Sequence, residues 1–135
     1  MNKNQDFKWK FIKPQDLKEI FEWWNHYGFK KVEPTSLPKL GLMVSKNGIN
    51  LYSCFIYSSD SDIVWMEWVV SNPKADVKLK RGAFEKMMEV LEVVLKLKGV
   101  SKVFTSTNLD VFKNKLKKND FVETDSNVTH FIKSY

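Results

Sequence analysis

The sequence predicts an α/β fold in which helices flank a mixed central β-sheet. Segments with alternating apolar residues, typical of strands, are interleaved with segments whose apolar residues recur at three- and four-residue spacing, typical of helices. A meander of three strands over residues 41–72 is followed by a long helix and a further short strand. Because a strand–helix–strand connection of this length is a right-handed crossover with parallel pairing, the sheet is expected to contain both strand orientations.

The chain opens with an expected strand and an amphipathic helix. Phe7, Trp9 and Phe11 alternate with Lys8, Lys10 and Ile12, which is the period of a strand. Pro14 suits the first turn of a helix over residues 14–27, and Gly28 is a natural stop. The inner face of this helix is expected to carry residues at i, i+3, i+4 and i+7, namely Leu17, Ile20, Phe21 and Trp24.

The meander begins after a proline-containing connection over residues 29–40. Its first two strands, 42–45 and 49–57, are joined across Asn47-Gly48, the strongest short hairpin signal, because both positions tolerate a positive φ. A second polar turn leads to a third strand over 63–71, which Pro73 closes.

The second half of the chain is expected to add helices to the other side of the sheet. Residues 80–98 form the longest predicted helix, with a broad apolar arc suited to packing on a sheet. A short strand over 102–105 follows, and Asn108 is placed to cap a helix over 109–118. A closing hairpin is expected last, with strands over 122–124 and 129–133.

Composition narrows the class of protein. The 135 residues, 43% of them hydrophobic, suit one domain with one core. Cys54 is the sole cysteine, so neither an intramolecular disulfide nor a cysteine-based metal cluster can form, and two histidines, His26 and His130, do not suggest a metal site. The chain shows no secretory signal and no apolar run of membrane-spanning length, so a cytoplasmic protein without membrane contact is expected.

Almost all of the positively charged residues of the chain are lysines. The net charge is +6, and Arg81 is the single arginine. Base recognition and phosphate forks favour arginine, whereas lysine acts as a point charge. The lysines at 113, 115, 117 and 118 make one predicted helix strongly basic, but no nucleic-acid recognition motif is present. A solvated helix face is the favoured interpretation, and nucleic-acid binding is the weaker one.

The order of elements resembles the GNAT superfamily of acyl-CoA N-acyltransferases over essentially the whole chain. The last meander strand ends in Trp68-Val69-Val70-Ser71-Asn72-Pro73, like the family strand that runs into a proline before the cofactor loop. The next helix opens with Lys78-Leu79-Lys80-Arg81-Gly82-Ala83, and the segment 108–121 is similar to an asparagine-led helix of the family. The chain resembles the small members of this superfamily that bacteriophages encode and that have a degenerate cofactor loop.

The resemblance implies acetyl-CoA as acyl donor, held where two parallel strands splay apart. Strands near 63–71 and 102–106 would separate at their carboxyl ends, so an extended pantetheine arm can pair with unpaired backbone groups. The adjacent helix start offers N–H groups to the pyrophosphate. Arg81 replaces the first family glycine, whose role Gly82 can take one position later. The implied cofactor-binding residues are Val69, Val70, Ser71, Lys78, Lys80, Arg81, Gly82, Ala83 and Asn108.

Glu67 is the candidate catalytic base of the implied transferase. Its apolar neighbours Trp65, Met66 and Trp68 would raise its pKa toward neutrality, which suits proton removal from an ammonium group. The alternative is a carboxylate that faces solvent or pairs with a lysine. Many family members place a proton-donating tyrosine where this chain has Leu116, so the usual general acid is missing.

Trp23 and Tyr27 are the candidate acceptor-binding residues. The inner face of the first helix is already filled, so these two aromatics are expected to be partly exposed at i and i+4, where they can cradle an amine. Packing against the connection 29–40 is the alternative.

The resemblance leaves several functions open. The first hypothesis is transfer of acetyl from acetyl-CoA to an amine on a small molecule or a protein, by direct attack. The second keeps the fold without catalysis, as a binding protein for a protein partner, and Arg81 and Leu116 favour it. The sequence leaves the acceptor, the acyl length and the oligomeric state undetermined, with a homodimer among the expectations.

Overall fold

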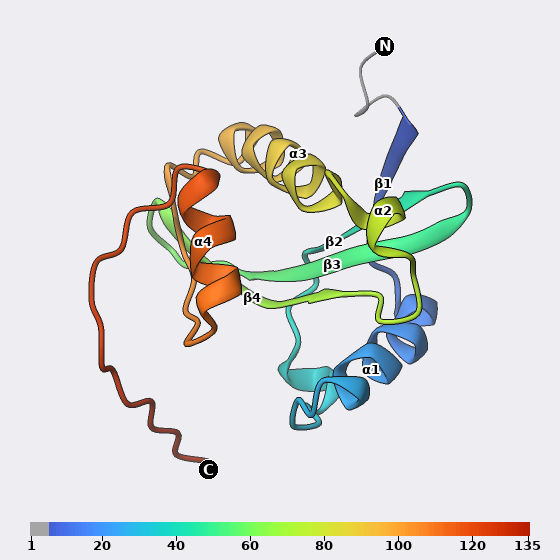
Figure 1. Cartoon of the computed structure of the whole chain (residues 1–135). Helices are drawn as coiled ribbons and strands as arrows, with labels where there is room; N and C mark the ends of the chain where they lie inside the picture. The colour runs from blue at the N-terminus through green and yellow to red at the C-terminus, as the bar shows by residue number, and fades with distance from the viewer. Residues whose placement is uncertain (1–5) are drawn as a thin grey trace.

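The computed structural model describes residues 6–135 (Figure 1). Two short 3-10 turns, Pro14–Asp16 and Pro34–Ser36, precede α1 and β2, respectively. Among the described residues, no helix is long and apolar enough to cross a bilayer. The strands and helices in chain order are β1 (Phe7–Phe11), α1 (Leu17–His26), β2 (Gly41–Lys46), β3 (Ile49–Tyr57), β4 (Ile63–Ser71), α2 (Val77–Lys80), α3 (Ala83–Leu97), β5 (Lys102–Phe104) and α4 (Asp110–Lys118).

Within residues 6–135, the sheet has five strands in the order β1-β2-β3-β4-β5. The first four pair antiparallel, and β5 pairs parallel to β4 after the α3 crossover. The β2–β3 hairpin turns at Asn47 and Gly48, with φ of 53° and 76°, which is the left-handed conformation that an Asn-Gly turn favours. This mixed sheet with flanking helices confirms the predicted fold class.

Helices cover both faces of the sheet (Figure 1). α3 and α4 pack on one face, where Leu42, Cys54 and Met66 meet Phe84, Leu91 and Leu116 in the larger apolar cluster. α1 packs on the opposite face, where Ile20, Trp23 and Trp24 meet Met43, Phe55 and Val70. The strands alternate between the two clusters, as expected for a sheet buried on both sides.

The outer strand β1 presents lysines to solvent. Lys8 and Lys10 are exposed, and the Lys10 ammonium lies 2.7 Å from the Asp16 carboxylate. Asp16 also accepts a hydrogen bond from the Lys13 amide at 2.8 Å. This contact fixes the turn between β1 and α1.

Three predicted elements differ from the structure. The long helix is interrupted: α2 ends at Lys80 and α3 begins at Ala83, because Gly82 adopts a φ of 87° that a helix cannot contain. Leu109, not Asn108, is the N-cap residue of α4. The prediction of a closing hairpin over residues 122–124 and 129–133 is wrong, since segment 121–135 contains no strand.

Candidate active site

Strand β4 extends well beyond its parallel neighbour β5. The paired residues end at Trp65 and Phe104, and the Thr105 hydroxyl then donates to the Met66 carbonyl at 2.8 Å. From Glu67 to Ser71, β4 has a strand beside it on the β3 side only, within the sheet of the described residues. The pairing of these strands therefore ends where the sequence predicts that they part, and the stretch Glu67–Ser71 of β4 without a β5 partner is called the opening below.

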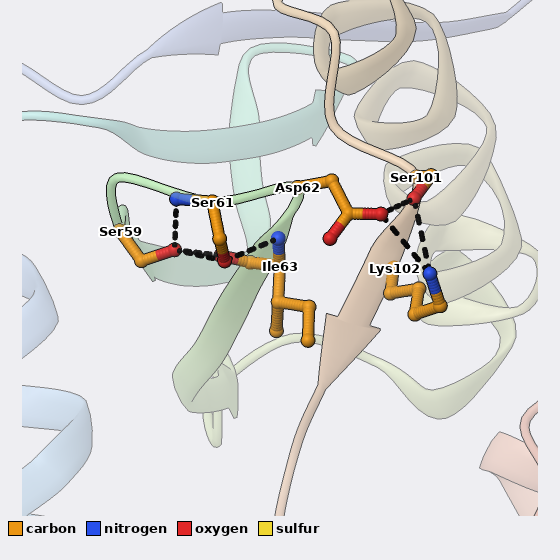
Figure 2. A network of polar contacts seen from close by, with 6 residues as sticks. All are labelled: Ser59, Ser61, Asp62, Ile63, Ser101 and Lys102. Carbon is orange, nitrogen blue, oxygen red and sulfur yellow. Dashed lines mark hydrogen bonds and ion pairs between the residues drawn. The ribbon is translucent and has the colours of Figure 1, made fainter.

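A polar network fixes the closed end of this opening (Figure 2). The Asp62 carbonyl accepts from the amides of Ser101 and Lys102 at 2.9 and 3.1 Å. The Asp62 carboxylate accepts from the Ser101 hydroxyl and lies 3.0 Å from the Lys102 ammonium. The hydrogen bond from the Ser101 hydroxyl has the largest effect on the pKa of the Asp62 carboxyl, and the one from the Lys102 ammonium comes next. Both lower this pKa. The network holds the starts of β4 and β5 together, so the strands part at their other ends.

A β-bulge shapes the open part of β4. The β3–β4 register shifts between Ser53 and Phe55, and Trp68 has a φ of 58°. A non-glycine residue in this left-handed region is strained unless its surroundings hold it. The Trp68 indole stacks on Trp24 and donates from Nε1 to the Tyr57 hydroxyl at 3.1 Å. These contacts hold the bulge immediately before Val69.

Glu67 lies on the α1 side of the sheet, at the start of the opening. Its cross-strand partner is Phe55, whose side chain belongs to the cluster under α1. Burial raises the pKa of Glu67, and the charge of His130 opposes this effect. Trp65, two residues earlier in β4 and so on the same face of the strand, stacks on Phe104 with ring centroids 5.4 Å apart. The carboxylate is therefore half-buried among aromatic side chains, an environment that makes it a stronger proton acceptor than a carboxylate in water.

The start of α3 is the second element of the candidate site, after the open part of β4. Arg81 is exposed in an ordinary extended conformation, with φ −61° and ψ 123°, and Gly82 takes the left-handed conformation before the helix. The amide of Lys86 donates to the Gly82 carbonyl at 3.0 Å. The N–H groups of Ala83–Glu85 therefore have no carbonyl partner within the helix. Such a helix start favours an anionic ligand.

Two partly buried lysines converge on the cross-strand pair Tyr52–Ser71. The Lys80 ammonium donates to the Asn72 carbonyl at 3.0 Å and lies 3.5 Å from the Ser71 hydroxyl. The Lys115 ammonium donates to the Tyr52 hydroxyl at 3.1 Å and lies 5.5 Å from the centre of the Phe84 ring, in the first turn of α3. Two cations thus stand beside the α3 start.

Lys115 was not singled out from the sequence, where it counted as one lysine of a solvated face. The signal that could have found it is its spacing from Phe112 and Leu116. Both pack against the larger apolar cluster, and positions i, i+3 and i+4 share a helix face.

The two candidate acceptor-binding residues, Trp23 and Tyr27, differ in burial. Trp23 is 3% exposed and belongs to the core under α1, so the expected partial exposure was wrong, because α1 is enclosed on a wider arc than its spacing suggested. Tyr27 is exposed, and its hydroxyl lies 3.1 Å from the Ser71 hydroxyl. Tyr27 therefore borders the end of β4.

The remaining candidates are placed as follows. Leu116 is buried in the larger apolar cluster, so a hydrocarbon side chain occupies the position of the implied general acid. Asn108 and Lys78 are exposed. Burial raises the pKa of the Cys54 thiol to about 12, which leaves no thiolate for nucleophilic attack at neutral pH.

Comparison with known proteins identifies the fold. No protein-family model and no curated protein sequence matches the chain. Among solved structures, an aminoglycoside acetyltransferase from an uncultured soil metagenomic sample is similar, with a TM-score of 0.66, 11% identity and 97% of each chain covered. The acetyltransferase AAC(6')-Iy, in complex with a CoA bisubstrate analogue, gives a TM-score of 0.71 at 11% identity, covering 95% of this chain and 99% of its own.

A third solved structure extends the comparison to a plant enzyme. Glucosamine-6-phosphate N-acetyltransferase from Arabidopsis thaliana gives a TM-score of 0.58 at 14% identity, with 94% of this chain and 99% of that chain covered. The chain therefore has the fold of the GNAT acetyltransferases.

Proposed function

We propose that this protein is an N-acyltransferase that moves an acetyl group from acetyl-CoA to an amine. The observation that carries the proposal is the opening beside Glu67–Ser71, where β4 continues without a β5 partner next to the α3 start. Solved structures of the same fold contain coenzyme A or a bisubstrate analogue of it, which supports the choice of cofactor.

The described residues fit a thioester cofactor. Backbone groups of Val69, Val70 and Ser71 are available to pair with an extended pantetheine arm as an added strand would. The N–H groups at the start of α3 can bind the pyrophosphate, with Lys80 and Lys115 as neighbouring cations. Gly82 leaves the approach to these N–H groups free of a side chain. Lys78, Arg81 and Asn108 are solvent-exposed candidates for the outer part of the cofactor.

The chemistry requires a proton acceptor on the amine side of the opening. Glu67 can take a proton from the ammonium directly or through one water molecule, leaving a neutral amine as nucleophile. The amine nitrogen then bonds to the thioester carbon, and the carbon–sulfur bond breaks. An amide at Val69 or Val70 would stabilise the charge on the carbonyl oxygen. Because Leu116 has no ionisable proton, water carries the proton to the departing thiolate, and this proton is the second one that the nitrogen loses as the amide forms.

Tyr27 is proposed as a contact of the acceptor amine. Its ring is exposed and its hydroxyl lies at the end of β4. The face of an aromatic ring attracts a cationic amine. Trp23 is left out of this role because it is buried.

A second function, a binding protein of the same fold without catalysis, is favoured by one observation. Leu116 is buried in the core, so no proton donor stands at that position. Nucleic-acid binding has less support, because Lys113 and Lys117 lie 3.6 Å from Asp110 and Glu123, respectively, and Lys115 points toward Tyr52.

Calorimetric titration of the full chain with acetyl-CoA tests the proposal. Saturable binding is expected, with a matching rise in the unfolding temperature, because a ligand of the native state stabilises it. The Lys115→Met variant should bind about tenfold more weakly, the loss expected for one charged hydrogen bond. Lys118→Met, at an exposed position of the same helix, serves as the matched control.

Turnover separates the two candidate functions. With a panel of amines, release of free thiol should be detectable for the unaltered chain and lost in Glu67→Gln, while Glu67→Gln retains acetyl-CoA binding. Binding without turnover on any amine or protein extract would favour the binding protein. No binding at millimolar acetyl-CoA would reject both the cofactor and the transferase.

A further inference from the structure

Two large aromatic side chains, Trp65 and Phe104, are exposed on the α1 side of the sheet. They are cross-strand partners in β4 and β5, and their rings stack with planes inclined by 18°. The Asp62 network at the starts of both strands holds this pairing (Figure 2). Trp65 is 42% exposed and Phe104 is 38% exposed. These two residues are called the aromatic pair below, and they present an apolar surface to solvent.

The aromatic pair is not part of the core. Neither side chain belongs to the apolar cluster under α1 or to the larger cluster on the other face. Large aromatic side chains stabilise a protein when they are buried. Two such side chains that stay exposed side by side on neighbouring strands therefore indicate contact with a ligand.

The Glu67 carboxylate lies next to the aromatic pair. Glu67 follows Trp65 by two residues in β4, on the same face of the strand, so their backbone positions are about 6.6 Å apart. His130 lies close enough to Glu67 for its charge to act on that carboxyl, and the aromatic pair remains exposed with the segment of His130 in place. One ligand can therefore reach both the carboxylate and the rings when a short alkyl chain joins its cation to its apolar part.

We propose that the acceptor of this protein is a primary amine joined to an aromatic ring by a short alkyl chain. The ammonium group pairs with the Glu67 carboxylate, and the ring of the acceptor packs against Trp65 and Phe104. The inference rests on the proposed function, because it names the class of acceptor for the same site. The ammonium group loses two protons, one to Glu67 and one through water to the departing thiolate, and the product is the N-acetyl amide.

The charge of the chain favours an acceptor with a single cation. The net charge of +6 repels acceptors that carry many positive charges. A single ammonium group needs one carboxylate, which Glu67 provides. The aromatic ring of the acceptor then supplies the contact area that further charges would supply in a polycation.

Binding of phenethylamine to the full chain tests the site without a reaction, and butylamine is the aliphatic comparison. In calorimetric titrations, phenethylamine should bind about tenfold more tightly than butylamine, the gain expected for packing of one aromatic ring. Trp65→Ala and Phe104→Ala should each remove most of this difference. Trp9→Ala is the matched control, because Trp9 is also 42% exposed and contacts the Phe11 ring, but lies in β1 at the opposite edge of the sheet. Circular dichroism verifies that each variant is folded.

Turnover separates this inference from the proposed function. With acetyl-CoA, kcat/KM should be about tenfold higher for phenethylamine than for butylamine, and Trp65→Ala should lower the value for phenethylamine alone. Equal kcat/KM for both amines, unchanged in Trp65→Ala, would overturn the inference and leave acyl transfer standing. Absence of phenethylamine binding would overturn it as well. Phenethylamine binding that Trp65→Ala and Glu67→Gln both weaken, without turnover of any amine, would support the site and reject acyl transfer.

Discussion

The Trp68 indole stacks on Trp24, with ring centroids 4.8 Å apart and planes inclined by 29°. Trp68 belongs to β4 and Trp24 to α1, so the contact joins the bulged strand to the helix above it. Because Trp68 has a φ of 58°, the stack holds a backbone conformation that would otherwise be disfavoured. The opening of the candidate site begins beside this bulge.

Trp68→Ala is expected to lower the free energy of unfolding by about 2–3 kcal/mol, since it removes a packed aromatic ring and leaves a cavity. Trp65→Ala, in the same strand, removes an exposed ring from its stack with Phe104 and should cost about 1 kcal/mol. Urea unfolding of both variants gives the comparison. Equal losses would contradict the role given to the Trp24–Trp68 contact.

Glu67→Gln is expected to stabilise the protein at neutral pH. Burial raises the pKa of Glu67 in the folded state, so the unfolded chain loses this proton at a lower pH than the folded protein does. Between the two pKa values the folded state binds more protons, and stability therefore falls as the pH rises through that interval.

A glutamine at position 67 does not ionise, so its burial does not carry the cost of removing a charge from water. The unfolding temperature of Glu67→Gln should exceed that of the unaltered protein at pH 7, and the difference should shrink as the pH falls toward about 4, the ordinary range of glutamate. A difference that does not change with pH would show that Glu67 is not desolvated.

Gly82→Ala and Gly99→Ala are matched variants at the two ends of α3. Both glycines have a positive φ, 87° and 75°, so each substitution should lower the free energy of unfolding by about 1–2 kcal/mol. Gly82 alone stands at the proposed pyrophosphate site. Stabilisation by acetyl-CoA should therefore be reduced in Gly82→Ala and unchanged in Gly99→Ala, as measured by thermal shift.

Ser53→Ala is expected to leave stability unchanged or to raise it by up to about 1 kcal/mol. The Ser53 hydroxyl is buried and has no hydrogen-bond partner among the described residues, so its removal relieves a desolvation cost. Thr105→Val is the contrasting variant, because its hydroxyl donates to the Met66 carbonyl. That variant should lose about 1 kcal/mol. A loss in Ser53→Ala as large as that in Thr105→Val would indicate an interaction of the Ser53 hydroxyl.

Much of the fold could be predicted because its signals are local. The Asn47-Gly48 turn has the predicted hairpin conformation, and the strands 49–57 and 63–71 have the predicted bounds. In these segments turn chemistry and side-chain alternation act within a few residues. The register shift at Trp68, in contrast, depends on a contact with a residue 44 positions earlier in the chain, which no local pattern contains.

The surroundings of the candidate site could be predicted only in part. The sequence places Glu67 in the strand β4 and Gly82 before the helix α3, as the structure has them, and the roles given to these two residues stay predictions. Trp23 was misplaced, since residues of the connection after α1, Phe29, Val32 and Leu37, close over the same cluster. The predicted hairpin over 122–133 carries a strand pattern, but a pattern does not specify which edge the strand meets.

The lysines of β1 have a consequence for the behaviour of concentrated solutions. If two molecules met through their β1 edges, Lys8 and Lys10 of one would approach the same cations of the other, and their repulsion would oppose the contact. Edge-to-edge pairing of two sheets through β1 is therefore opposed. A fibre built by such pairing needs both edge strands of every molecule to accept a partner, so this chain is protected from open-ended polymerisation.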